Sequence, residues 1–454
     1  MDGDDFRDAA DAVYEELLAR TGEGAPEHRL DATRRLVELL GDPQRAYPII
    51  HLTGTNGKTS TSRIIESLLR ACGLRTGLLT SPHLIRFTER IVIDGEPLSD
   101  EALVRSWADV KPYVEIVDAE LADKDKARLT FFEVVTALAF AVFADSPVDV
   151  AVIEVGMGGE WDSTNVGDGD VAVFTPISLD HTKQLGSTVS AIAHTKSGII
   201  KPCADVVTAT QQPDARDVLR EAADANEATF LEEGHDFEVL DSRLAVGGQV
   251  LTIRGRAATY SDVFLPLYGE HQAHNAALAL AAVETFLGRG TQALAPDLVS
   301  DGLGGATSPG RLQLVGVEPP VFVDAAHNPA GAEALVAAVT SFFSFSELAV
   351  VVGSLADKDS AGVVVPLTNI ADRLYVTQPD SDRARDAWEL AELVDSSALA
   401  GEVLVFSDPR EAIDAARAWA AEADGRAVLV TGSIVLIGMV MGYAADHGWK
   451  ATTA

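Results

Sequence analysis

The sequence predicts an α/β protein: a mostly parallel sheet flanked by helices, followed by a smaller C-terminal α/β domain. Two patterns lead to this fold class. Continuous apolar runs of strand length alternate with helical stretches, as in parallel sheets that are covered on both faces. The alternation is interrupted once, by a Gly-, Ser- and Pro-rich stretch at 299–315, and then restarts. The length of 454 residues also favours more than one hydrophobic core.

The first part of the chain supplies most of the predicted sheet. Asp94-Gly95, between apolar residues, is a hairpin signal. Apolar runs predict strands at 47–54, 75–81, 148–156 and 170–178, and the stretches between them predict helices at 59–71, 100–110, 131–144 and 188–199.

The pattern changes to short strands around Gly247-Gly248 between residues 228 and 268, which predicts an antiparallel edge to the sheet. A helix is expected at 269–287, and 299–315 is the best linker. We therefore expect a domain 1–307 and a domain 308–454. Strands of the second domain are predicted at 320–327, 347–355, 372–378, 402–408 and 427–433.

Composition and charge exclude several classes of partner. The chain is 47% hydrophobic and 23% charged, which is typical of a globular protein, and no apolar run approaches the ~20 residues that span a bilayer. The net charge of −34 disfavours nucleic acid and anionic membranes. Cys72 and Cys203 form neither a disulfide framework nor a metal knuckle, and the N-terminus is not a secretory signal. We expect a cytoplasmic protein.

The stretch GTNGKTS, residues 54–60, predicts a phosphate-binding loop. Gly54 and Gly57 permit a tight turn between a strand and a helix, whose positive end attracts anions. Lys58 adds a positive charge for the outer phosphates, and Thr59 offers a hydroxyl to Mg²⁺. The generic motif has a further Gly where this chain has Leu52. A kinase, a GTPase, a motor and a ligase are all compatible with such a loop.

Polar residues follow three other predicted strands. Ser81, Glu154 and His181 each lie at or just after the carboxyl end of a strand, the edge at which α/β sheets bind ligands. Glu154 suits Mg²⁺, which prefers oxygen ligands, and His181 is a candidate second ligand. Lys196 lies near the end of a predicted helix among small residues, where a surface lysine is the ordinary interpretation.

Taken together, these stretches resemble the Mur ligase superfamily, and within it the folylpolyglutamate synthase/dihydrofolate synthase branch. The family form of the phosphate loop also lacks the first Gly. The resemblance runs in order from about residue 29 to residue 433, through TSPHL, ERIVIDG, TFFEVVTALAF, EVGMGGEWDSTN, DHTKQLG, KSGIIK, HQAHNAALAL, PGRLQ, DAAHNPAGA, DKD and TGS.

The resemblance implies an enzyme that uses ATP and Mg²⁺ to join L-glutamate to dihydropteroate, to folate polyglutamates, or to both, through an acyl phosphate. It implies a phosphate-loop domain of the Mur ligase central type and a Rossmann-like C-terminal domain. It also implies a monomer with small-molecule substrates. The implied nucleotide-binding residues are Gly54, Thr55, Asn56, Gly57, Lys58, Thr59, Asn275, Arg311 and Asp324; the metal ligands are Ser81, Glu154 and His181; the catalytic residues are Lys58, Lys196 (as a carbamate), Asp324 and His327; and the substrate-contacting residues are Phe132, Glu133, Gly158, Gly159 and Ser433.

Three positions depart from the family pattern. Glu160 replaces an Arg, and Thr195 and Ser197 flank Lys196 where the family has other residues. Two alternatives stay open: another Mur-type amino-acid ligase, and a regulatory ATPase or switch. About fifty residues precede the loop, too few for the additional domain of several peptidoglycan Mur ligases. A switch would need neither Lys196 nor the His327 motif.

Overall fold

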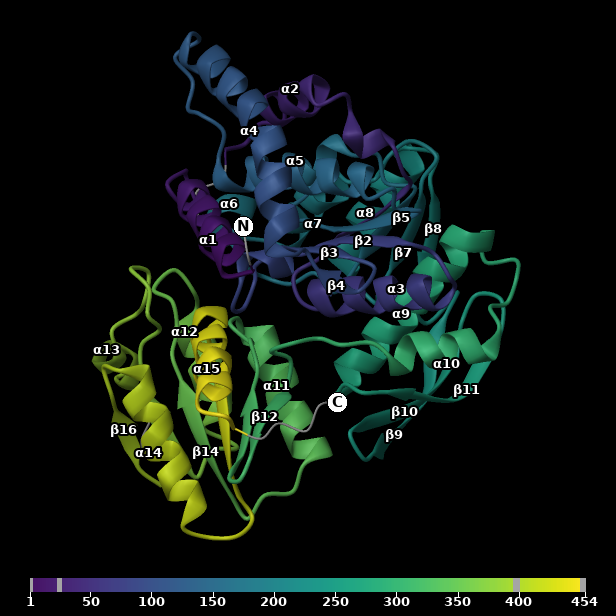
Figure 1. The fold of residues 1–454 in the computed structure, drawn as a ribbon. Helices are drawn as coiled ribbons and strands as arrows, with labels where there is room; N and C mark the ends of the chain where they lie inside the picture. Colours follow the sequence, from purple (N-terminus) through teal and green to yellow (C-terminus); the bar gives the residue numbers. More distant parts are fainter. Residues whose placement is uncertain (1–2, 23–26, 395–400, 450–454) are drawn as a thin grey trace. The chain divides into compact units, whose positions relative to one another are not determined.

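The computed structural model describes residues 3–22, 27–394 and 401–449, which form two compact units (Figure 1). The first unit comprises Met1–Asp241, Leu251–Phe264 and His274–Ala306, and the second comprises Ser242–Val250, Leu265–Ala273 and Thr307–Ala454. Each unit contains a mostly parallel sheet with helices, so the predicted fold class is confirmed. The domain limits 1–307 and 308–454 stay a prediction.

The first unit is built on a sheet of eight described strands in the order β4-β3-β2-β5-β1-β6-β7-β8. The six strands from β2 to β8 in this order are parallel, whereas β3 is antiparallel to β2 and β4 to β3. The carboxyl ends of β1, β2, β5 and β6 therefore share one edge. These strands are β1 (Ile49–Thr53), β2 (Thr76–Leu79), β3 (Ile91–Ile93), β4 (Glu96–Pro97), β5 (Val150–Glu154), β6 (Val171–Phe174), β7 (Asp205–Thr208) and β8 (Thr229–Glu232).

Each helix predicted before residue 306 is present, although the one that begins at residue 100 is much longer than expected. None of the described helices has both the length and the apolar character needed to cross a membrane. They are α1 (Gly3–Leu18), α2 (Asp31–Leu39), α3 (Lys58–Ala71), α4 (Asp100–Ala122), α5 (Phe131–Asp145), α6 (Thr182–Leu185), α7 (Val189–Ser197), α8 (Pro213–Ala225), α9 (Glu270–Gly288) and α10 (Pro296–Gly304), with 3₁₀ segments η1 (Pro43–Arg45), η2 (Phe87–Arg90) and η3 (Ser163–Val166).

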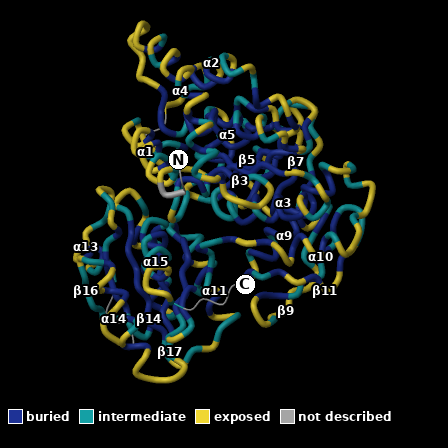
Figure 2. The backbone as a smooth tube through the Cα atoms, in the orientation of Figure 1, coloured by how far each residue is buried: buried dark blue, intermediate teal, exposed yellow. Residues whose placement is uncertain are grey.

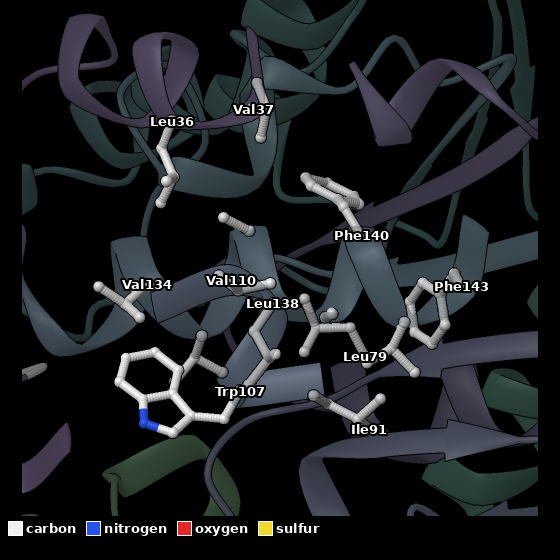
Figure 3. Packing of buried hydrophobic residues seen from close by; sticks show 14 of the residues in the cluster. Leu36, Val37, Leu79, Ile91, Trp107, Val110, Val134, Leu138, Phe140 and Phe143 are labelled. Carbon is white, nitrogen blue, oxygen red and sulfur yellow. The ribbon is translucent and has the colours of Figure 1, made fainter. Parts of the chain in front are cut away.

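One extensive core of the first unit lies where α2, α4 and α5 pack on one face of the sheet (Figure 3). Helix α5 is apolar on nearly all sides, as expected of a helix that is covered by others. The central strands are buried along their whole length, whereas exposed residues gather on the outer helices and loops (Figure 2). Labelled members of this core in Figure 3 include Leu79, Ile91, Trp107, Val110, Val134, Leu138 and Phe143.

The predicted hairpin around Asp94-Gly95 is confirmed. Both residues have positive φ, 55° and 85°, and they join the antiparallel strands β3 and β4. This geometry matches the two-residue turn that the Asp-Gly pair favours.

The prediction for 228–268 was wrong in one respect. The first strand of this region, β8, joins the main sheet in parallel to β7. The others, β9 (Glu238–Ala245), β10 (Gly248–Arg254) and β11 (Thr259–Leu265), form a separate three-stranded sheet in the order β11-β10-β9. Alternating apolar and polar residues predict a strand but not which sheet it joins, because the partner strand is a tertiary property. The predicted linker is also shorter, since α10 extends through residue 304.

The second unit contains a sheet of six described strands in the order β12-β13-β17-β14-β15-β16, parallel except for β12. All five strands predicted after residue 308 are present. Its elements are β12 (Gln313–Val317), β13 (Pro320–Val323), β14 (Glu347–Val352), β15 (Arg373–Val376), β16 (Val403–Val405) and β17 (Arg426–Thr431), with helices α11 (Pro329–Phe342), α12 (Ser360–Leu367), α13 (Ala387–Ala391), α14 (Pro409–Ala421) and α15 (Ile434–Asp446).

Candidate active site

The loop 54–60 connects β1 to α3 and requires glycine at two positions. Gly54 and Gly57 have φ of +149° and +87°. A Cβ atom on Gly54 would lie 1.9 Å from Thr175 Oγ1, and one on Gly57 would lie 2.7 Å from Asn275 Oδ1. Residues 55–59 stay partly accessible. The loop is therefore closely packed behind and open in front, as a phosphate site at a helix N-terminus needs to be.

Leu52, which replaces the generic Gly, is not part of the loop. It is a fully buried residue of β1 and lies beside Glu154 of β5 in the parallel register. The turn begins only at Gly54. The position at which the generic motif has Gly is consequently a strand position in the sheet core. Leu52 therefore removes no flexibility from the phosphate-binding turn.

Two lysine side chains meet at one carbonyl group of this loop. The Lys58 Nζ donates to the Gly54 and Thr55 carbonyl oxygens at 3.1 and 3.2 Å. The Lys196 Nζ, from the end of α7, donates to the same Gly54 oxygen at 2.7 Å. Lys196 is buried, and its burial, together with the positive charge of Lys58, holds the pKa of Lys196 well below its usual range. Lys196 is thus not an ordinary surface lysine.

Glu154 stands at the carboxyl end of β5 beside this pair. It is buried, and its Oε1 accepts a hydrogen bond of 3.0 Å from the Thr59 hydroxyl. Ser81 and His181 lie after β2 and β6 on the same sheet edge. His181 has a positive φ of 49° and precedes α6.

The donor atoms at this edge fit Mg²⁺. The described residues contain no group of three or more His, Cys, Asp and Glu side chains arranged for a metal. Mg²⁺ is commonly held by one or two carboxylates and by substrate phosphates, rather than by such a cage. The Glu154 carboxylate and the Thr59 hydroxyl, 3.0 Å apart next to a phosphate loop, provide this kind of oxygen site.

The glycines of GMGG make room for the segment that carries Lys196. A Cβ on Gly159 would lie 2.7 Å from the Lys196 carbonyl oxygen, and one on Gly158 would lie 2.9 Å from Thr195 Cγ2. The Glu160 N–H donates to the Thr195 carbonyl oxygen at 2.8 Å. Two positions that depart from the family pattern, 160 and 195, therefore contact each other through the backbone.

Ser197, the third position that departs from the family pattern, makes its contact within α7. The Ser197 hydroxyl donates to the His194 carbonyl oxygen at 2.7 Å, one turn earlier in the same helix. With Ser197 as its neighbour, Lys196 still reaches the Gly54 carbonyl oxygen.

Groups of the protein itself already supply hydrogen bonds to the Glu133 carboxylate, without a substrate. Glu133 and Thr130 form a capping box at the start of α5. Both carboxylate oxygens of Glu133 also accept from Arg29, each at 3.0 Å. The neighbouring Phe132 ring lies against Gly156, where a Cβ would come within 2.5 Å. Sequence reasoning missed Arg29; its place just before α2, a helix that was not predicted, gave no separate signal.

Asp162 is a second residue that the motif alone did not single out. Its buried carboxylate accepts from the Met157 N–H at 2.9 Å and from the Thr164 N–H at 3.0 Å, which holds the glycine loop in place. The Thr164 hydroxyl also lies 2.9 Å from His51 Nε2. Burial raises the pKa of Asp162, although these hydrogen bonds act in the opposite direction.

His83, in the TSPHL stretch, was also missed as an individual residue. The Arg90 Nε donates to His83 Nδ1 at 2.8 Å, so Nε2 carries the proton and faces the Tyr14 hydroxyl at 3.3 Å. Burial and the charge of Arg90 lower the pKa of His83 to about 3. A neutral His83 therefore fixes the segment that follows Ser81.

In the second unit, three of the predicted residues lie around the end of β13: Arg311, Asp324 and His327. The Asp324 carboxylate is buried and accepts from the N–H groups of Leu312 and Ala326, both at 2.8 Å. Burial raises the pKa of Asp324, against the charge of nearby Arg311. The His327 Nδ1 donates to the Ala325 carbonyl oxygen at 2.9 Å, which directs Nε2 away from the backbone.

Ser433 lies at the adjacent strand end, just after β17, at the N-terminus of α15. It is 1% exposed, and its Oγ finds no hydrogen-bond partner in the part of the chain that the structure describes. A buried, unsatisfied hydroxyl at a helix N-terminus is suited to an anionic ligand group.

The fold and this site define a phosphate-loop enzyme of the ligase type, with a second lysine at the loop. Residues 52–283 match the Mur ligase middle domain, and residues 310–434 match the Mur ligase glutamate ligase domain. The chain belongs to the Mur ligase family, and it is an ATP-dependent ligase.

The relatives place the chain in one branch of that family. It is 44% identical over 438 residues to the dihydrofolate synthase/folylpolyglutamate synthase of Mycobacterium tuberculosis, covering 91% of this chain and 90% of that protein. The structure of Mycobacterium tuberculosis folylpolyglutamate synthase complexed with ADP matches with a TM-score of 0.92 and 41% identity, over 98% and 100% of the two chains. FolC of Escherichia coli in complex with DHPP and ADP matches with a TM-score of 0.81 and 30% identity, over 93% and 94%. The chain thus belongs to the dihydrofolate synthase/folylpolyglutamate synthases.

Proposed function

We propose that this protein ligates L-glutamate to dihydropteroate, to folate polyglutamates, or to both, with cleavage of ATP to ADP and phosphate. The acid substrate's carboxylate oxygen attacks the γ-phosphorus of ATP, and ADP leaves, which yields an acyl phosphate. The amine of glutamate then attacks the acyl carbon, phosphate departs and the amide forms. No side-chain nucleophile is needed, so positioning and electrostatic stabilisation carry the rate.

One observation carries this proposal: Lys58 and Lys196 donate to the same Gly54 carbonyl oxygen. A switch or a simple ATPase needs the first lysine, which holds the outer phosphates, but not the second. The names of the relatives, and the DHPP and ADP in the Escherichia coli complex, support the substrates.

In this proposal the loop residues Gly54 to Thr59 and Asn275 hold the nucleotide. Glu154, Ser81 and His181 hold Mg²⁺, which when bound neutralises charge on the phosphates. The Thr59 hydroxyl, which donates to Glu154, would offer a further oxygen to the same ion.

Lys196 is proposed to react with CO₂. A neutral amine attacks the carbon of CO₂ and loses one proton to water, which forms a carbamate anion. The lowered pKa of Lys196 supports this step because it makes the neutral amine available. The product keeps one N–H, which can still donate to Gly54.

The remaining predicted residues are assigned to the pterin side of the site and to the C-terminal domain. Phe132, Glu133, Gly158 and Gly159 are proposed to form the pterin side. Residues 308–454 are proposed as the glutamate-ligase domain, in which Arg311 and Asp324 serve the nucleotide, and His327 and Ser433 face the substrates. A monomeric state and a cytoplasmic location stay predictions.

Phosphate release tests the reaction. We expect release from ATP only when glutamate and a pteroate or folate are both present. Release without either acceptor would favour a simple ATPase, and release with glutamate and another acid alone would favour a different amino-acid ligase. Separate rescue of cells that lack dihydrofolate synthesis or polyglutamylation then assigns the two activities; we expect both.

Lys196→Ala tests the carbamate. We expect loss of turnover and partial recovery with added short carboxylates, whereas Lys183→Ala, at an exposed lysine of α6, should behave as wild type. A ¹³C carbamate signal in wild type under ¹³CO₂, absent from Lys196→Ala, is the second measurement. An active variant that added carboxylates do not affect would contradict the assignment.

A further inference from the structure

Arg63 is a charged residue near the phosphate loop to which the proposed function assigns no role. It lies on α3 four residues after Thr59, so the two residues share one face of the helix. Long helical side chains lean back toward the helix N-terminus, which here is the end that carries the phosphate loop. Arg63 is only half-buried, so a ligand can reach it.

Three carboxylates lie close enough to the Arg63 side chain to act on its charge: Glu154, Glu89 and Glu66, of which Glu154 acts most strongly. Burial nevertheless outweighs their combined effect and lowers the pKa of Arg63.

None of these carboxylates forms an ion pair with Arg63, and each of them accepts a hydrogen bond from another group. Within the described ranges, the Arg63 guanidinium makes no hydrogen bond and no ion pair within 4.0 Å. Its five N–H donors consequently require acceptors from water or a ligand. The carboxylates accept instead from Thr59 Oγ1 (Glu154, 3.0 Å), from the N–H groups of Leu84, Ile85 and Arg86 (Glu89, 2.7 to 3.0 Å), and from Thr76 Oγ1 and Arg70 Nε (Glu66, 2.6 and 3.2 Å).

We propose that Arg63 is a further substrate-binding residue, which holds an anionic oxygen of the acid substrate, as carboxylate or acyl phosphate, beside Glu154. A guanidinium matches the planar, two-oxygen geometry of a carboxylate. Lys58 and the loop already serve the nucleotide at the first turn of α3, and Arg63 starts about 7.5 Å further along the helix than Lys58. The acid, rather than ATP, is thus the ligand that this position suits. The inference rests on the proposed function.

The test compares Arg63→Gln and Arg63→Lys with Arg75→Gln, which removes the same charge at an exposed arginine of the first unit. We expect Arg63→Gln to lower kcat/KM for dihydropteroate on the order of 10- to 100-fold, the typical effect of one charged hydrogen bond, and to keep ADP affinity within about twofold. Arg63→Lys should recover part of the loss, because it keeps the charge but not the planar fork. Arg75→Gln should behave as wild type.

Two further measurements separate binding from folding. Thermal unfolding reports whether each variant is folded, and added guanidinium ion should partly restore Arg63→Ala but not a variant that has lost its fold. An unchanged kcat/KM in Arg63→Gln, or an equal loss of ADP affinity, overturns the inference. Wild-type protein without acid-dependent phosphate release overturns the proposed function instead.

Discussion

His51 makes the stability of the first unit depend on pH in a direction that the structure determines. It is 1% exposed in the central strand β1, and burial lowers its pKa to about 3. Its Nε2 faces the Thr164 hydroxyl at 2.9 Å, while Nδ1 has no hydrogen-bond partner in the described chain. A proton on His51 would create a buried, unpaired charge.

The sign and size follow from the two pKa values. In the unfolded chain His51 titrates near its usual value of about 6.5, so below that pH the unfolded state binds a proton that the folded state excludes. The free energy of unfolding therefore falls as the pH drops through about 6.5, and it continues to fall toward about 3. Between pH 7.5 and pH 5.0 the loss due to His51 is about 2 kcal/mol.

Urea denaturation of wild type and His51→Gln across this pH range measures the effect. Glutamine can keep a hydrogen bond to Thr164 but does not titrate, so its overall stability can differ at pH 7.5 while its pH dependence is smaller by about 2 kcal/mol. The difference between the two slopes cancels every other titrating group. Parallel curves for the two proteins would refute the assignment of a buried, neutral His51.

Three further predictions concern the loop and its surroundings. Leu52→Gly, which restores the generic motif, should lower the free energy of unfolding by more than about 3 kcal/mol in urea denaturation without raising ADP affinity, because it empties a buried strand position. Gly57→Ala should weaken ADP binding in calorimetry at least tenfold, because a Cβ would clash with Asn275 at a φ of +87°; an unchanged affinity would contradict the geometry. Arg29→Met should destabilise the protein by roughly 3 kcal/mol, since it leaves the carboxylate of Glu133 buried without its ion partner, and thermal unfolding checks this. Equal stability of Arg29→Met and wild type would show that this pair contributes nothing.

The sequence by itself determined the class of fold, the places of most strands and of several helices, and the identity of the phosphate loop. These are local properties: apolar runs of strand length predict strands, and the order Gly-Lys-Thr after β1 predicts a turn at a helix N-terminus. The motifs also identified Lys196 and Glu154 without any knowledge of where their side chains lie. The departure at Leu52 is local too, and the register of β1 with β5 shows that it belongs to the strand and not to the turn.

Only the tertiary structure decided which distant residues meet. Lys196 contacts an oxygen of Gly54, 142 positions earlier, and Asn275 packs on Gly57. The partner sheet of β9–β11, the pairing of Glu133 with Arg29 and the isolation of Arg63 among engaged carboxylates have the same origin. Each depends on how helices and strands pack against one another, because contacts between distant segments follow from the packing of the whole chain, whereas motifs and periodicity report only the neighbourhood of each residue in the chain.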